Sequence, residues 1–144
     1  MRKGKKRCVI SYPTLRVIER AVNMLQNLYP TDLIEWKGSG RKQAEQAVAA
    51  ARWAFQLSKG QACTMRKLAA AATLFYELIT LHPLVDGNKR LATLLLGAFL
   101  IKNDLPTPKN LYKPALKIAG GEWSREDVYK WLLRAYRYYK TTKK

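Results

Sequence analysis

The chain has 144 residues, a hydrophobic fraction of 48% and a formal net charge of +17, from 27 Lys and Arg against 10 Asp and Glu. This length suits one domain with a sizeable core and is too short for two. The charge exceeds what solubility requires and favours a polyanionic or acidic partner. No apolar run follows the basic N-terminus and no uncharged stretch reaches membrane-spanning length, so we expect a cytoplasmic protein without membrane association.

Part of the basic charge is concentrated at the two ends of the chain. We expect a basic N-terminal arm over residues 1–10, a helical domain over residues 11–140 and a basic tail over residues 141–144. Such runs are usually solvated ends, although they can associate with ribosomes or nucleic acid. The two cysteines, Cys8 and Cys63, make neither a disulfide framework nor a metal-ligand set, so free thiols are expected.

Three helices are predicted in the first half of the chain. Apolar residues recur at helical spacing over residues 15–25, which end before Pro30, and over residues 44–55, which end before Gly60. The same spacing predicts an amphipathic helix from residue 65 to about residue 81.

Three more helices are predicted in the second half. Residues 88–103 have almost no polar face, which in a soluble protein indicates a helix buried on most sides. A short helix over residues 114–118 precedes a Gly-Gly pair, and Ser124 with Asp127 resembles a capping box that opens a last helix. No segment shows the convincing alternation of apolar and polar residues that is typical of a strand. We therefore predict an all-α, single-domain bundle around the central buried helix, with loops over residues 29–40, 58–64 and 103–113.

A nine-residue run between two of these helices carries the chemistry. Its side chains are a base, a carboxylate, an amide and two cations around a glycine: His82, Asp86, Gly87, Asn88, Lys89 and Arg90. Histidine is the side chain whose ordinary proton affinity lies near neutral pH, and His82 is the only one in the chain. Asp86 offers the hard oxygen that Mg²⁺ prefers. Gly87 permits a close turn, after which the cations and the helix N-terminus would face one anion.

The sequence His-Pro-Leu-Val-Asp-Gly-Asn-Lys-Arg-Leu-Ala over residues 82–92 resembles the signature of the Fic/Doc family in its Doc (death-on-curing) form. That form has Lys where typical Fic adenylyltransferases have a second Gly after the Asn, and this position is Lys89. The similarity extends roughly over residues 44–136, because residues 119–126 and Trp131-Leu132 also resemble the end of Doc-like domains. One departure is Leu84, which replaces the usual Phe.

The resemblance implies a Fic-like helical fold and a role for each motif residue. His82 would be the general base, Asp86 would hold Mg²⁺, and Gly87 with Asn88 would form an anion hole. Arg90 would grip nucleotide phosphates. Lys89 implies that ATP is the co-substrate and that its γ-phosphate is transferred to a Ser or Thr hydroxyl of a target protein.

In that family such a toxin kinase arrests growth, with a translation factor as the target. Family members also carry a small flap beside the site, which by position alone would be residues 58–64. Two alternatives stay open: a Fic-type adenylyltransferase with the same base and metal, and a non-catalytic nucleic-acid-binding module, which the charge favours.

Many family members carry an inhibitory helix of pattern Ser/Thr-x-x-x-Glu-Gly/Asn. The chain lacks it, because residues 31–35 are followed by Trp36 and residues 73–77 by Leu78. We therefore expect no self-inhibition of this kind and a separate antitoxin.

Overall fold

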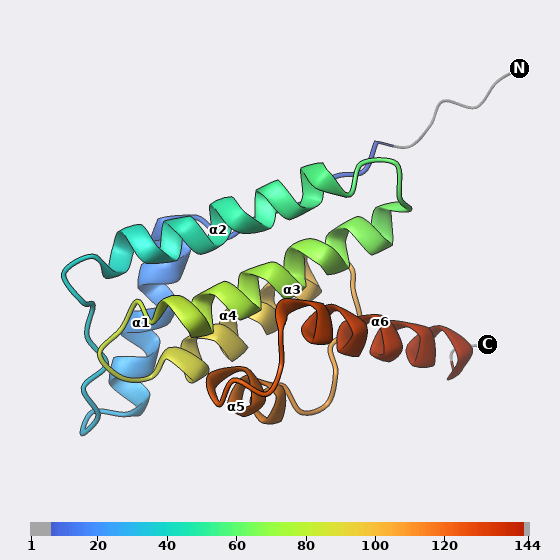
Figure 1. The fold of residues 1–144 in the computed structure, drawn as a ribbon. Coiled ribbons are helices and arrows are strands. Elements are labelled where there is room, and N and C mark those ends of the chain that lie inside the picture. Colours follow the sequence, from blue (N-terminus) through green and yellow to red (C-terminus); the bar gives the residue numbers. More distant parts are fainter. Residues whose placement is uncertain (1–6, 143–144) are drawn as a thin grey trace, which may run out of the picture.

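Six helices make up most of residues 7–142, the part of the chain that the computed structural model describes (Figure 1). They are α1 (Leu15–Leu28), α2 (Gly40–Leu57), α3 (Cys63–Leu81), α4 (Asn88–Lys102), α5 (Tyr112–Ala119) and α6 (Arg125–Thr142). Within this range the only extended pairing is two isolated bridges. The all-α prediction is confirmed, with helix ends that differ from the predicted ones by a few residues.

The helices α3 and α4 form the centre of the bundle. Helix α3 contacts α2, α4, α5 and α6, while α4 contacts α1, α3 and α5. The predicted central helix is therefore buried along most of α4, and α3 shares that position. The fully buried side chains of these two helices include Leu68, Leu74, Phe75, Leu78, Ile79, Leu91, Leu96 and Leu100.

The start of the last helix is the capping box that the sequence predicts. The Ser124 amide N–H donates to Asp127 Oδ2 at 2.9 Å, and the Asp127 N–H donates to Ser124 Oγ at 3.2 Å. These bonds satisfy donors that the first turn of α6 would otherwise leave free.

Cys8 and Cys63 form a disulfide, with a Cα–Cα distance of 5.5 Å, so the expectation of free thiols is wrong. The Ser11 N–H donates to Asn103 Oδ1 at 2.7 Å, and Asn103 Nδ2 donates to Ser11 O at 2.9 Å. These two bonds hold the N-terminal segment against the end of α4, near the start of α3. A count of cysteines excludes a multi-bridge framework, but it does not exclude one pair that the fold brings together.

The flap expected over residues 58–64 is also misplaced. Residues 58–62 make a tight turn between α2 and α3, and these two helices run antiparallel, so the turn lies at the end of the bundle opposite the motif (Figure 1). The segment that pairs with the motif loop is residues 34–37. Lys37 N–H donates to Pro83 O at 3.0 Å, and Val85 N–H donates to Glu35 O at 2.8 Å.

The predicted arm and tail are only partly covered. Residues 1–6 and 143–144 lie outside the described residues, so the domain boundaries stay predictions. Over residues 7–142, no helix has the length and apolar character needed to cross a membrane.

Candidate functional site

The motif loop makes two left-handed turns between α3 and α4. Helix α3 ends at Leu81, and the next residue, His82, has φ 52° and ψ 63°. Gly87 has φ 87° and lies immediately before α4. A Cβ on Gly87 would lie 3.2 Å from Ile34 Cγ1, so both the backbone angle and the close approach require glycine there.

Asn88 holds the loop in this shape. Its Oδ1 accepts from Leu84 N–H at 2.8 Å, and its Nδ2 donates to Leu84 O at 2.8 Å. Asn88 and Leu84 are both buried. Leu84 thus packs beneath the loop as the usual Phe would, while the Asn88 side-chain amide holds the loop through these two hydrogen bonds.

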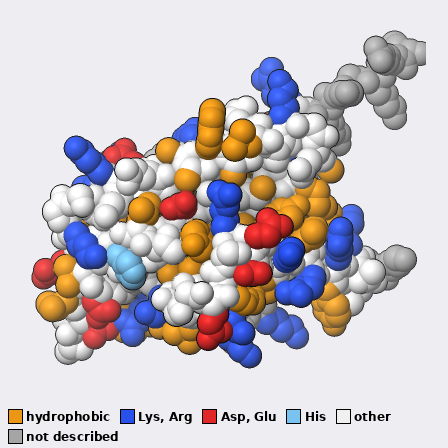
Figure 2. Space-filling model, in the orientation of Figure 1, with side chains coloured by type: hydrophobic (Ala, Val, Ile, Leu, Met, Phe, Trp, Pro, Cys, Tyr) orange, Lys and Arg blue, Asp and Glu red, His pale blue; other side chains and the backbone are white. Residues whose placement is uncertain are grey.

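His82 is exposed, and the only histidine of the chain is visible at the surface (Figure 2). Asn88 Nδ2 lies 3.4 Å from His82 Nδ1. The two hydrogen bonds to Leu84 fix the direction of the Asn88 amide, so the group facing His82 is Asn88 Nδ2, which can only donate. This contact favours the His82 tautomer that carries its proton on Nε2 and accepts at Nδ1. At 3.4 Å the contact is weak, so a change of tautomer at His82 costs little.

The start of α4 offers unpaired backbone donors. No side chain caps this helix, and its first turn contains no acidic residue. The N–H groups of Asn88, Lys89 and Arg90 occupy the first three positions of the helix, where no intrahelical acceptor exists. Together with the positive helix end and the two cationic side chains, they form a site suited to a phosphate.

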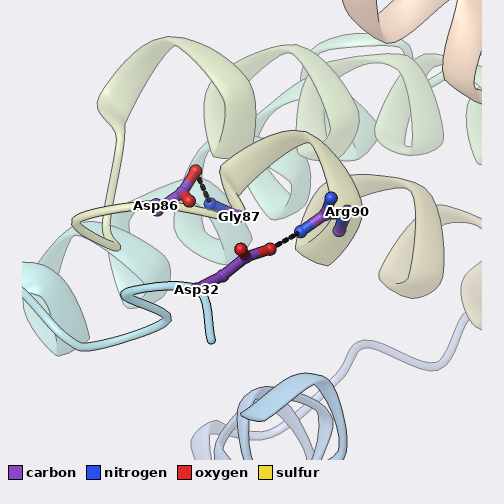
Figure 3. A network of polar contacts seen from close by, with 4 residues as sticks. All are labelled: Asp32, Asp86, Gly87 and Arg90. Carbon is purple, nitrogen blue, oxygen red and sulfur yellow. Dashed lines mark hydrogen bonds and ion pairs between the residues drawn. The ribbon is translucent and has the colours of Figure 1, made fainter. Parts of the chain in front are cut away.

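Asp86 is exposed beside these donors, and its Oδ1 accepts from Gly87 N–H at 2.8 Å (Figure 3). Within residues 7–142 no group of three or more His, Cys, Asp or Glu side chains could hold a metal ion by itself. A single exposed carboxylate fits Mg²⁺ when substrate phosphates supply the other ligands, which is how proteins commonly bind this ion.

Arg90 is already paired in this structure. Its Nη1 lies 2.6 Å from Asp32 Oδ2 (Figure 3). The guanidinium also lies 3.9 Å from the centre of the Tyr29 ring. The hydrogen bond to Asp32 raises the pKa of the Arg90 guanidinium above its ordinary value, so the group stays charged. The chain lacks the inhibitory-helix pattern, yet an acid from the loop after α1 contacts the arginine expected to grip phosphates.

A groove of about 760 Å³ is lined by Arg90 and by other residues of the end of α1, the first half of α4 and the segment before and at the start of α5. Two tyrosines with exposed rings, Tyr29 and Tyr112, line it beside apolar side chains. Its lining is completed by Met24, Leu25, Leu28, Thr93, Leu94, Lys109, Asn110 and Leu111. A groove of this composition, with Arg90 and Lys109 as its cations, suits an amphipathic ligand with a flat ring and an anionic end.

The six predicted site residues all lie on one loop and the first turn of α4, as their spacing requires. Residues that the sequence did not single out come from elsewhere. Asp32 and Tyr29 contact Arg90, and Gly40 begins α2 so close to the loop that a Cβ there would lie 2.1 Å from Pro83 O. Residues 34–37, which pair with the motif loop, gave only one signal in the sequence. This was a short alternation of apolar and polar residues around Ile34 and Trp36, which is too brief to predict a strand.

Comparison with known proteins identifies the family of the segment that contains the motif loop. A model of the Fic/DOC family matches residues 10–100, which is more than half of the chain and includes the whole motif loop. No curated protein matches the chain, and no solved structure matches it either. The chain therefore belongs to the Fic/DOC family and is a Fic-type enzyme of the protein-modifying kind, a transferase that acts on protein hydroxyls.

Proposed function

We propose that this enzyme is a Doc-like toxin kinase that transfers the γ-phosphoryl group of ATP to a Ser or Thr hydroxyl of a target protein and so arrests growth. The observation that carries the proposal is Lys89. It occupies the first turn of α4, between Asn88 and Arg90, where adenylylating members of the family have glycine. By family resemblance the target is a translation factor.

The motif residues supply the groups that this transfer needs. His82 accepts the proton of the target hydroxyl, whose oxygen attacks the γ-phosphorus as the bond from that phosphorus to the β-phosphate oxygen breaks and ADP leaves. The free N–H groups at the start of α4 bind the phosphates, with the side chains of Lys89 and Arg90. Asp86 would hold Mg²⁺, which when bound neutralises charge on the phosphates.

The groove beside Arg90 supports a nucleotide as the ligand. Tyr29 and Tyr112 flank the groove and can contact a base or ribose while Arg90 contacts a phosphate. Asp32 takes one guanidinium nitrogen of Arg90 in this structure, so Asp32 competes with a phosphate for this group.

The position of the label in ATP tests which group is transferred. The protein, Mg²⁺ and a cell extract are incubated with ATP labelled on either the α- or the γ-phosphate. We expect a labelled protein band only from the γ-labelled ATP. Label from the α-position would establish AMP transfer, and no label from either would refute transferase activity toward proteins in that extract.

Lys89→Gly is the matched variant for the same assay. A lysine at this position fills space and adds charge where one end of the triphosphate binds, so it favours one nucleotide orientation over the other. We expect Lys89→Gly to lose most γ-phosphoryl transfer and to gain detectable AMP transfer. Arg90→Ala should depress both reactions. Unaltered γ-transfer in Lys89→Gly would show that Lys89 is not the selector.

A separate antitoxin and the compartment are further parts of the proposal. An acidic partner fits the net charge of +17. The sequence favoured the cytoplasm, but the Cys8–Cys63 disulfide is of a kind that persists in oxidising compartments. Thiol labelling of the protein taken directly from its cells would decide between the two environments.

A further inference from the structure

The C-terminal part of α6 carries cations that the proposed reaction does not use. We propose that this part of α6 binds single-stranded nucleic acid, through a basic face formed by Arg134, Arg137, Tyr138 and Lys140. These four side chains are exposed. At 100° per residue Arg134, Arg137 and Tyr138 lie on the side of α6 opposite Leu132, which is buried. Lys140 lies at one edge of this side, about 80° from Leu132, with its Nζ 6.0 Å from the centre of the Tyr136 ring.

The charge on this face is unbalanced. The acidic residues of α6, Glu126 and Asp127, lie in its first turn. No acid follows them in the sequence, and the ion pairs of the described chain, Arg41–Glu19 and Arg90–Asp32, are elsewhere. In Figure 2, blue side chains gather over the part of the surface where α6 continues toward its end, and red ones lie near its beginning.

After Leu132, this part of the helix meets the core through side chains that are only partly buried, Leu133 and Tyr136. Val128 and Leu132 are the buried residues of α6, so no residue described after Leu132 is fully buried. A helix that continues for ten residues past its last buried side chain has a face free for a partner. The face lies far along α6 from the motif loop (Figure 1).

Tyr138 favours nucleic acid over an acidic protein or an anionic membrane. Tyr138 is 70% exposed and lies beside Arg134 on this face, about 40° from it around the helix. An exposed flat ring among cations suits an unpaired base, which stacks on aromatic side chains while its phosphates meet Lys and Arg. The exposed face has no aliphatic stripe of the kind that inserts into a membrane. From Arg134 to Lys140 the helix rises about 9 Å, the length of roughly three stacked nucleotides.

Fluorescence anisotropy with a labelled twelve-nucleotide oligo-U RNA tests the proposal on the full chain. The variant replaces Arg134, Arg137 and Lys140 with Gln. The control replaces three exposed cations elsewhere, Arg16, Arg20 and Lys42, so that both proteins lose the same charge. We expect the α6 variant to bind at least about tenfold more weakly, and its slope of log affinity against log salt to fall by about 2, at roughly 0.7 per lost phosphate contact. The control should stay within about threefold of the original protein.

Stacking is tested separately at Tyr138. Tyr138→Ala should weaken binding about fivefold or more with an unchanged salt slope, and Tyr138→Phe should bind like the original protein. Thermal unfolding midpoints of all variants should agree with that of the original protein, because the replaced side chains are exposed.

Four results would overturn the proposal. One is an equal loss of RNA affinity in the control variant, which would show that the loss depends on the net charge of the protein and not on the α6 face. Another is competition by poly-glutamate as effective as that by RNA at equal charge, which would indicate an acidic protein as the partner. The others are binding to duplex as tight as to single strands, and binding to anionic vesicles that the α6 variant loses while RNA binding is kept.

Discussion

Replacing Asp32 with asparagine removes the carboxylate that holds Arg90 while keeping the size of the side chain. If nucleotide phosphates and Asp32 compete for the same guanidinium, the variant should bind ATP more tightly. The gain in affinity for ATP then corresponds to the free energy of the Asp32–Arg90 ion pair, because phosphate binding no longer has to break it.

The size of the effect follows from the exposure of the pair. Arg90 and Asp32 keep 35% and 32% of their side-chain accessibility. An ion pair this open to solvent contributes up to about 1 kcal/mol, which corresponds to about a fivefold gain in affinity for ATP. The Tyr29 ring still contacts the guanidinium in the variant, so Arg90 keeps part of its position.

Titration calorimetry with Mg²⁺ and ATP measures this gain. Glu35→Gln is the matched control, because Glu35 is an exposed acid on the same segment and the ion pairs of the described chain do not include it. The reasoning is refuted if Asp32→Asn binds ATP no more tightly, or if Glu35→Gln gives the same gain. The gain from Asp32→Asn should also vanish in an Arg90→Ala background.

Three further predictions concern single groups. His82→Asn should reduce phosphoryl transfer by about a hundredfold or more and leave the unfolding midpoint unchanged, because Asn tolerates the left-handed backbone at this position. His82→Ala should reduce transfer and also lower the unfolding midpoint. A folded and active His82→Asn variant would contradict the role of His82 as general base. Cys63→Ser should lower the free energy of unfolding by about 4 kcal/mol at most in a urea titration, since it opens a loop with a sequence separation of 55, and an unchanged midpoint under oxidising conditions would contradict this. Backbone and side-chain hydrogen bonds from Ser124 lower the pKa of Asp127 from its ordinary value of 3.8. The ionised carboxylate therefore stabilises the fold fully above pH 3.8, and this stabilisation is lost as the pH falls through the lowered pKa. Asp127→Asn should flatten the dependence of the unfolding midpoint on pH in this acid range, and an unchanged pH profile would contradict this role of Asp127.

The parts of the fold that the sequence predicted are those encoded by neighbouring residues. The apolar run of α4 required a buried helix, and Ser124 with Asp127 formed the predicted capping box because both partners lie within one turn. The motif residues lie together for the same reason.

The parts that the sequence did not predict depend on residues far apart in the chain. Asp32 and Arg90 are separated by 58 positions, and no local pattern connects them. The flap was assigned by position to the turn after α2, whereas pairing with Pro83 and Val85 selects residues 34–37 once α2 and α3 have packed antiparallel. Such contacts follow from tertiary packing, which periodicity alone does not encode.

The disulfide changes the connectivity of the molecule as well as its stability. Residues 8–63 form a covalent ring that contains α1, α2 and the segment that pairs with the motif loop. A protease that cuts the backbone once inside this ring, for example after the exposed Lys37, leaves two pieces still joined through sulfur. The fragment bearing Asp32 and Tyr29 therefore stays attached to α3 and α4 after such a cut, and only reduction can release it.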